Sequence, residues 1–289
     1  METEMSGNVL RLPAPAKLNL MLRVVGRKPD GYHLLQTVFQ FIDRCDWLTF
    51  RLGSDRRIGL KNALPGVPED IDLTVRAARL LREAGADPVR GVEIEIEKNL
   101  PMGGGLGGGS SDAATTLLGL NKLWEVGLSI DALAELGLQL GADVPVFVRG
   151  YAAWAEGVGE NLTPLPDLPE PWYVVVTPPC HVATARVFSA PGLTRDNKPI
   201  KITDFLAGQE ENHCLPVVSA MYPQVRDALI ALGAYSEQPK LTGTGACVFS
   251  AFADKAEADN AARNLVSRWQ VFVARGANIS PLHRALGLV

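Results

Sequence analysis

The chain has 289 residues, of which 47% are hydrophobic and 21% are charged, a composition typical of a globular protein with a sizeable core. A formal net charge of −4 argues against nucleic-acid binding through a broad basic face. Every apolar run ends well before it could span a bilayer, so we expect no membrane partner. The four cysteines stand singly and residues 1–8 contain no apolar stretch, so we expect free thiols and a cytoplasmic protein.

The hydrophobic pattern predicts strands and helices in irregular order along the chain. Early apolar strands are interrupted by Pro13 and Pro15, and the strict apolar/charged alternation at Val92–Glu97 predicts a strand with one buried face. The predicted strands are 8–25, 34–42, 47–52, 92–97, 172–177, 247–252 and 270–274, and the predicted helices are 73–84, 113–124, 130–140, 223–232 and 255–269. A half-solvated strand in irregular order favours an α+β fold, with helices on one face of antiparallel sheets.

One proline-rich stretch, residues 163–171, is the best candidate for a domain linker. We find no internal repeat and no low-complexity tract. The expected organisation is therefore an N-terminal domain at residues 1–162 and a C-terminal domain at residues 163–289.

The segment at residues 101–112 carries the strongest functional signal in the sequence. Six of the seven residues from 103 to 109 are glycine, which is an entropic cost that an idle loop would not normally carry. Glycine lets an anion approach backbone N–H groups without meeting Cβ atoms, and Ser110, Ser111 or Asp112 can cap a following helix. Open amides at the positive end of a helix predict a phosphate-binding site.

Three alternatives for this loop are less favoured. A flexible linker seldom lies between a patterned strand and an amphipathic helix. A Walker A loop requires lysine after its last glycine, where this chain has Ser110. Gly103, Gly105 and Gly108 match the dinucleotide fingerprint, but the strand before that fingerprint should be apolar on both faces, unlike Val92–Glu97.

The glycine segment, residues 101–114, resembles the second motif of the GHMP kinase superfamily, named for galactokinase, homoserine, mevalonate and phosphomevalonate kinases. Residues 15–20 are similar to the first motif and residues 241–249 to the third. The resemblance implies a two-domain GHMP kinase fold, with an N-terminal domain like ribosomal protein S5 domain 2 and a ferredoxin-like C-terminal domain. It also implies ATP and Mg²⁺ as cofactors, with the magnesium ligands left open and Ser111 a possible contributor.

Four further stretches narrow the resemblance to the family of kinases that act on 4-diphosphocytidyl-2-C-methyl-D-erythritol. They are residues 15–19, 27–33, 141–147 and 278–283. The resemblance runs from about Leu12 to His283. It implies that ATP phosphorylates the 2-hydroxyl of this cytidine-diphosphate-linked sugar alcohol, giving the 2-phosphate and ADP, in non-mevalonate isoprenoid biosynthesis.

The resemblance assigns catalysis to Asp143 and Lys17. Taken alone, an aspartate between Gly141 and Pro145 is more often a turn former than a catalyst. The matching family aspartate is the general base that takes the proton from the attacking hydroxyl. Lys17 is expected beside it, where its charge lowers the hydroxyl pKa and offsets charge on the transferring phosphoryl group.

The remaining site residues also follow from the resemblance. Tyr32 and His33 are similar to the family's cytidine-recognition pair, and Phe188 is either a stacking surface for cytosine or an ordinary core aromatic. Asp72 stands where many members have asparagine, which leaves the adenine contact open. The expected substrate-binding residues are Asn19, Tyr32, His33, Asp143, Phe188, Gly243 and Gly245. The expected nucleotide-binding residues are Lys98, Pro101, Met102, Gly103, Gly104, Gly105, Leu106, Gly107, Gly108, Gly109, Ser110 and Ser111.

Other functions are weighed against this assignment. Another GHMP small-molecule kinase, such as homoserine or mevalonate kinase, is the nearest alternative. A non-catalytic nucleotide sensor would be expected to lack Lys17 or Asp143, and an S5-like RNA-binding module should be basic. The sequence leaves the oligomeric state open.

Overall fold

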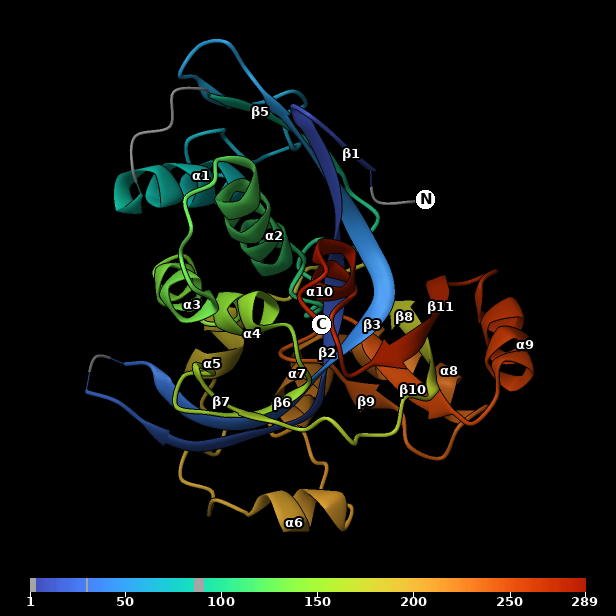
Figure 1. The fold of residues 1–289 in the computed structure, drawn as a ribbon. Coiled ribbons are helices and arrows are strands. Elements are labelled where there is room, and N and C mark those ends of the chain that lie inside the picture. Colours follow the sequence, from blue (N-terminus) through green and yellow to red (C-terminus); the bar gives the residue numbers. More distant parts are fainter. Residues whose placement is uncertain (1–3, 30, 86–90) are drawn as a thin grey trace.

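The computed structural model describes residues 4–29, 31–85 and 91–289 of the chain (Figure 1). The described strands are β1 (Glu4–Ser6), β2 (Val9–Arg27), β3 (His33–Leu52), β4 (Ile58–Leu60), β5 (Val92–Glu97), β6 (Ala153–Glu156), β7 (Asn161–Pro164), β8 (Trp172–Thr177), β9 (Lys240–Leu241), β10 (Val248–Phe252) and β11 (Gln270–Ala277). The described helices are α1 (Leu73–Ala84), α2 (Gly108–Leu123), α3 (Ile130–Leu138), α4 (Val144–Arg149), α5 (Thr184–Ser189), α6 (Ile202–Leu206), α7 (Leu215–Met221), α8 (Pro223–Gly233), α9 (Lys255–Leu265) and α10 (Pro281–Leu286).

Two long antiparallel strands, β2 and β3, form the spine of the molecule (Figure 1). The main path of the sheet runs β1-β2-β3-β11-β8-β10-β9, with β5 and β6 also paired to β3. The pairing of β11 with β3 joins the C-terminal strands to the spine through Gly276 and Ala277. Only the short β4–β5 pair is parallel among the described strands. The predicted antiparallel α+β arrangement is therefore confirmed.

Helices cover the sheet in two groups, each with its own core. α1 to α4 lie on one side of the spine, and α8 and α9 lie against the C-terminal strands (Figure 1). One core cluster joins the spine to α1–α4 and includes Leu282 and Leu286 of α10. A second cluster packs β8 and β10 against α7, α8 and α9. The last helix of the chain thus belongs to the first core.

Local sequence signals set several element bounds correctly. The predicted helix at Leu73–Ala84 and strands at Val92–Glu97 and Trp172–Thr177 are confirmed at both ends. The two strands predicted at 34–42 and 47–52 are wrong as separate elements, because β3 is continuous and pairs with β2 along its length. Pro13 and Pro15 do not interrupt β2. Strand β1 pairs only with residues 9–11 of β2. At Pro13 and Pro15, the edge of β2 that faces away from β3 has no described strand partner, so the N–H groups that proline lacks are not needed there.

The proline-rich stretch at 163–171 is packed against the protein. Leu168 is buried, and the carbonyl oxygens of Pro166 and Leu168 accept hydrogen bonds from Nδ2 of Asn278. Its first residues belong to β7, so the proposed boundary at residue 162 falls inside a strand. The division into residues 1–162 and 163–289 stays a prediction.

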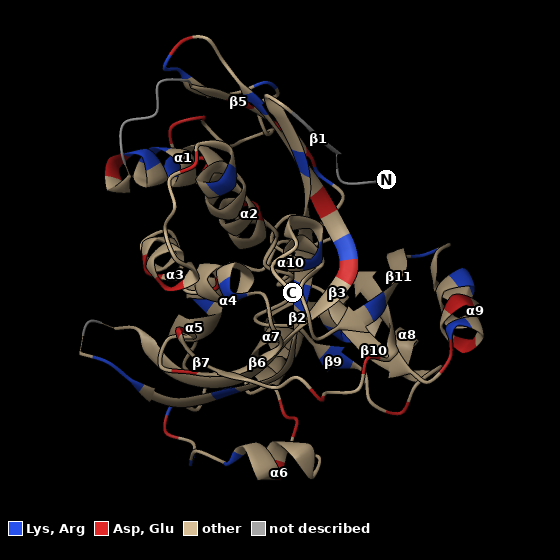
Figure 2. Cartoon of the chain, in the orientation of Figure 1, with Lys and Arg blue, Asp and Glu red and all other residues tan. Residues whose placement is uncertain are grey.

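The charged residues of the outer helix α9 are of both signs (Figure 2). Lys255 and Asp259 form an ion pair of 2.8 Å one turn apart on this helix. Charges of opposite sign placed one turn apart attract one another on this helix.

Candidate active site

Two irregularities in strand β2 aim Lys17 and Asn19 at the same cavity. The pairing of β2 with β3 shifts register between Pro15 and Lys17 and again between Asn19 and Met21. Bulges of this kind redirect side chains and are frequent beside active sites. Lys17 and Asn19 are both buried and lie two residues apart, so they share one face of the strand.

Asp143 meets Lys17 from a different element. It occupies the N-cap position of α4, but its side chain makes no capping hydrogen bond. Its Oδ2 atom lies 3.3 Å from Nζ of Lys17, and the Lys17 side chain is 4% exposed while that of Asp143 is 36% exposed. The carboxylate is thus held by a buried cation and still open to a ligand.

A buried hydrogen-bond chain fixes this lysine and its neighbour. Nζ of Lys17 donates to Oδ1 of Asn19, and Nδ2 of Asn19 donates to Oγ1 of Thr37 at 2.9 Å. Thr37 in turn donates to the carbonyl oxygen of Met21 at 2.6 Å. The amide orientation of Asn19 is therefore set, with its oxygen toward Lys17.

The glycine loop is pinned to the strand and to the third sequence motif. Backbone N–H groups of Lys17 and Cys247 donate to the carbonyl oxygens of Leu106 and Gly104, at 3.0 and 3.1 Å. Oγ1 of Thr242 donates to the Gly105 carbonyl oxygen at 3.1 Å. Gly105 has φ of +78°, and a Cβ atom there would lie 2.3 Å from the Thr242 carbonyl oxygen. Only glycine fits this approach.

Helix α2 begins inside the glycine run, which overturns one expectation. Its N-cap is Gly107, in the left-handed conformation and without a side-chain cap. The prediction that Ser110, Ser111 or Asp112 caps the helix is wrong, because all three already lie in its first turns. The first amides of α2 therefore belong to glycines, which leaves the helix N-terminus accessible to an anion.

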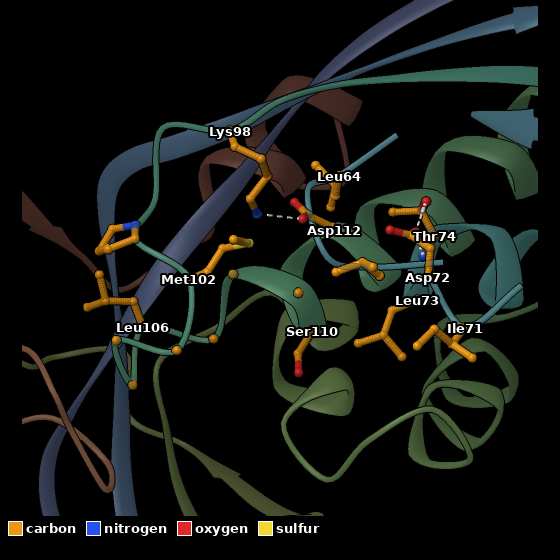
Figure 3. Close-up of a pocket in the computed structure, with 18 residues that line it drawn as sticks. Leu64, Ile71, Asp72, Leu73, Thr74, Lys98, Met102, Leu106, Ser110 and Asp112 are labelled. Atoms are coloured by element: carbon orange, nitrogen blue, oxygen red, sulfur yellow. Dashed lines mark hydrogen bonds and ion pairs between the residues drawn. The ribbon is translucent and has the colours of Figure 1, made fainter. Parts of the chain in front are cut away.

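A cavity of about 370 Å³ lies against this loop and the start of α2 (Figure 3). Lys98 and all predicted residues from 101 to 110 line it. Ser111 does not, because its side chain is fully buried beneath the loop. Its Oγ atom has no hydrogen-bond partner among the described residues.

Lys98 is held by two carboxylates at one side of this cavity. Its Nζ atom lies 2.7 Å from Oδ2 of Asp112 (Figure 3) and also pairs with Asp46. Burial lowers the pKa of Lys98, but Asp112 and Asp46 outweigh burial and raise it. Burial raises the pKa of Asp112 to about 7. Lys98 is charged at neutral pH, and its charge is already matched by these partners.

Apolar residues complete the lining of the cavity, and sequence reasoning missed most of them. Leu64, Val67, Ile71 and Leu73 line it, and Figure 3 shows Ile71 and Leu73 across the cavity from Leu106 of the loop. Ile71 is 56% exposed and Met102 is 61% exposed, which is unusual for apolar side chains and indicates a slot for a flat ring. No motif marks residues 64–71. Asp72 does not face this slot freely, because its Oδ1 caps α1 by accepting from N of Thr74 at 2.8 Å.

Rings from two distant segments form another cavity beyond Asp143. His33 stacks on Phe188 with ring centroids 4.8 Å apart and an interplanar angle of 20°. Both line a cavity with Tyr32 and Asp143, and Tyr32 is 64% exposed. Asp30, part of the motif at residues 27–33, lies outside the described residues.

A third cavity connects the other two. It is lined by Lys17, Asn19 and Asp143, shares Gly105 and Gly107 with the loop cavity, and shares Phe188 with the ring cavity. Gly243 also lines it. Gly245 lines none of the three, since it lies inside the turn of the third motif, where its N–H donates to the Thr242 carbonyl oxygen. Its assignment as a substrate-binding residue stays a prediction.

Two family models match the chain, GHMP kinases N terminal domain at residues 72–151 and GHMP kinases C terminal at residues 200–271. A 4-diphosphocytidyl-2-C-methyl-D-erythritol kinase from Methylococcus capsulatus is 61% identical, over 96% of this chain and 94% of its own length. The protein of the same name from Pseudomonas aeruginosa is 57% identical, over 96% of this chain and 97% of its own length. This chain belongs to the 4-diphosphocytidyl-2-C-methyl-D-erythritol kinase family.

Solved structures agree with this family assignment. A crystal structure of 4-(cytidine 5'-diphospho)-2C-methyl-D-erythritol kinase matches with a TM-score of 0.80 and 33% identity, covering 92% of this chain and 99% of that one. A homoserine kinase from Cytophaga hutchinsonii shares the fold, with a TM-score of 0.71 at 15% identity over 97% of this chain and 98% of that one. The expected two-domain GHMP kinase fold is confirmed.

The described residues form neither a preformed metal-binding cluster nor a membrane-spanning helix. Within the described part of the chain, no group of three or more His, Cys, Asp or Glu side chains is placed to hold a metal ion. The described helices are all too short or too polar to cross a bilayer.

Proposed function

We propose that this protein transfers the γ-phosphoryl group of ATP to the 2-hydroxyl of 4-diphosphocytidyl-2-C-methyl-D-erythritol. The products are the 2-phosphate and ADP, and the step belongs to non-mevalonate isoprenoid biosynthesis. The observation that carries the proposal is the position of Lys17 and Asp143. They lie in the cavity that joins the glycine loop to the His33–Phe188 rings. The names of relatives at 57 to 61% identity support the same substrate.

The lining of the loop cavity suits both the phosphate and the adenine parts of ATP. Bare amides at the start of α2 suit the phosphates, and the apolar slot at Ile71 and Met102 suits the adenine ring. Pro101 to Ser110 would supply most contacts. Lys98 would act from the side of the cavity, where its pairing with Asp46 and Asp112 limits it to a supporting role.

Mg²⁺ fits the same site with few protein ligands. This ion keeps several waters and binds chiefly through nucleotide phosphates, so a preformed cluster of carboxylates is not needed. Ser111, the predicted contributor, lies outside the cavity lining with its Oγ atom buried and without a described partner, so the start of α2 would have to rearrange before this oxygen reached the ion. When bound, Mg²⁺ would neutralise charge on the phosphates.

Asp143 and Lys17 suit the chemical step. The hydroxyl oxygen forms the new bond to the γ-phosphorus, the bond from that phosphorus to the bridging oxygen of ADP breaks, and the hydroxyl proton passes to the Asp143 carboxylate. Lys17, buried and 3.3 Å from this carboxylate, offsets the negative charge that gathers on the transferring group.

The ring cavity suits the cytidine end of the substrate. Phe188 and His33 present a stacked pair, and Tyr32 offers an exposed ring beside them. Asn19 and Gly243 line the central cavity, where the sugar alcohol would lie. Tyr32, His33 and Phe188 are therefore assigned to the base, and Asn19 with Gly243 to the reacting end.

A turnover assay with three acceptors tests the proposal. Purified protein with Mg-ATP is offered the cytidylated methylerythritol, homoserine and mevalonate, and ADP release is measured. We expect turnover with the cytidylated acceptor alone. Faster turnover with homoserine or mevalonate would support the alternative GHMP kinase, and ATP binding without any turnover would support a nucleotide sensor.

We further infer a small-molecule enzyme of the cytoplasm without a nucleic-acid or membrane partner. All four cysteines, Cys45, Cys180, Cys214 and Cys247, are free thiols, which suits a reducing compartment. The net charge of −4 is unfavourable for binding nucleic acid.

A further inference from the structure

Arg195, which no sequence motif singles out, contacts both residues of the stacked pair in the ring cavity, the ring of His33 and the backbone of Phe188. Its Nε atom donates to Nε2 of His33 at 3.2 Å, and its Nη2 atom donates to the carbonyl oxygen of Phe188 at 2.8 Å. The same guanidinium donates to the carbonyl oxygens of Ala190 and Leu193, at 2.7 and 3.0 Å. A rigid guanidinium with four such bonds holds the segment after α5 and the start of β3 in one geometry.

These contacts determine the tautomer of His33. A guanidinium has only donors and stays protonated, so Nε2 of His33 must be the acceptor. The proton of the neutral ring is then on Nδ1. Burial lowers the pKa of His33, and Arg195 and Arg27 lower it further. The ring is therefore neutral at pH 7, with Nδ1 as its donor.

We propose that Arg195 is a positioning residue for pyrimidine recognition, which locks His33 as the Nδ1–H tautomer and holds its stack on Phe188. The inference rests on the proposed function, because it deepens the assignment of the ring cavity to the cytidine end of the substrate. A cytosine ring offers acceptors at N3 and O2, whereas N3 of uracil carries a proton. Both bases have an acceptor at O2, so a fixed donor on His33 favours cytosine over uracil where it meets N3.

The tautomer is measured first, in the protein without substrate. Nitrogen-15 NMR of the histidine rings at pH 7.5 reports which nitrogen carries the proton, and a His33→Gln variant assigns the signal. We expect protonated Nδ1 and bare Nε2 in the wild type. Arg195→Leu should release the proton to both nitrogens, and Arg195→Lys, which keeps a donor, should retain part of the preference. Arg186→Leu, an exposed arginine of α5, is the matched control.

Kinetics then separate recognition from general stability. Arg195→Leu should raise KM for the cytidylated acceptor about 10-fold to 100-fold, the range for leaving polar groups of a partly buried site unpaired. Its kcat and its KM for ATP should stay near the wild-type values, and its preference for the cytidine over the uridine form of the acceptor should fall. Arg195→Lys should restore part of this preference.

Two results would overturn the inference. One is a wild-type His33 whose proton is on Nε2, and the other is an Arg195→Leu variant with unchanged tautomer and cytidine preference. The NMR result decides the role of Arg195 even if the wild type fails to phosphorylate the cytidylated acceptor, which would defeat the proposed function alone. If Arg195→Leu does not fold, the Arg195→Lys variant carries the same comparison.

Discussion

Nζ of Lys17 on strand β2 lies 3.3 Å from Oδ2 of Asp143 at the start of helix α4. The pair joins two segments far apart in the sequence and faces the cavity between the glycine loop and the ring pair. An ion pair with one partner this exposed adds little to stability, about 0–1 kcal/mol. The close approach of Lys17 and Asp143 is therefore better explained by the chemistry of the site than by a contribution of the ion pair to the stability of the fold.

Gly105 provides a test of the phosphate loop. In Gly105→Ala the new Cβ would lie 2.3 Å from the Thr242 carbonyl oxygen, so the loop must move. We expect ATP affinity, measured by calorimetry, to fall about tenfold or more. Gly127→Ala is the control, because it has a similar φ of +77° but no atom within 4 Å of the new Cβ. Equal losses of ATP affinity in the two variants would contradict phosphate binding by the glycine loop.

His283 anchors the helix that carries Asp143. Its buried ring hydrogen-bonds through Nε2 to the Val148 carbonyl oxygen at 2.8 Å, and a Cβ on Gly150 would lie 2.1 Å from its Cδ2 atom. We expect urea unfolding to show that Gly150→Ala and His283→Ala each cost about 2–4 kcal/mol. The double variant should lose at least about 1 kcal/mol less than their sum, since the clash needs both residues.

A matched control for this cycle is Gly66→Ala. Gly66 has φ of +77° and nothing within 4 Å of its would-be Cβ, so it carries the backbone strain without the clash. The loss of unfolding free energy in Gly66→Ala should add to that in His283→Ala. Additive losses for Gly150 and His283 would mean that the ring does not anchor α4.

Asp112 predicts how stability changes with pH. Burial raises its pKa from 3.8 to about 7 in the folded protein. The folded state therefore binds more protons than the unfolded state between these values, and this contribution to stability is lost as pH rises toward 7. Asp112→Asn keeps an acceptor for Lys98 and removes the ionisation. We expect its Tm, relative to the wild type, to increase from pH 5 to pH 8.

The control for Asp112 is an exposed aspartate. Asp131 pairs with Arg149 at 2.7 Å and its side chain is 75% exposed. Asp131→Asn should show little change in relative Tm over the same pH range. A constant Tm difference for Asp112→Asn from pH 5 to pH 8 would mean that Asp112 ionises normally.

Sequence patterns predicted the elements whose signals are local. Asp72 caps α1 and Ser129 caps α3 through bonds to amides two and three residues away, and β5 shows its buried face by alternation. The start of α2 was misplaced because glycine replaces the usual polar cap, so the Gly107 N-cap has no side chain to read.

The site depended on contacts that no local pattern contains. The sequence motifs identify Lys17, Asp143 and the glycine loop as candidate site residues. They do not reveal the contact of Lys98 with Asp46, which is 52 residues away, or that of Arg195 with His33, which is 162 residues away. Neither partner stands out in its own neighbourhood. Such contacts are set by packing of the whole chain, so they become visible only in the folded structure.

The most direct test of the central claim is Asp143→Asn, studied by ATP binding and by turnover of the cytidylated acceptor. The change keeps the side-chain shape and removes only the charge that accepts the proton. We predict ATP affinity within a few-fold of the wild type and a kcat lowered about 10²–10⁴-fold, the range for a lost general base. A variant that binds ATP normally and turns over at near wild-type rate would contradict the account.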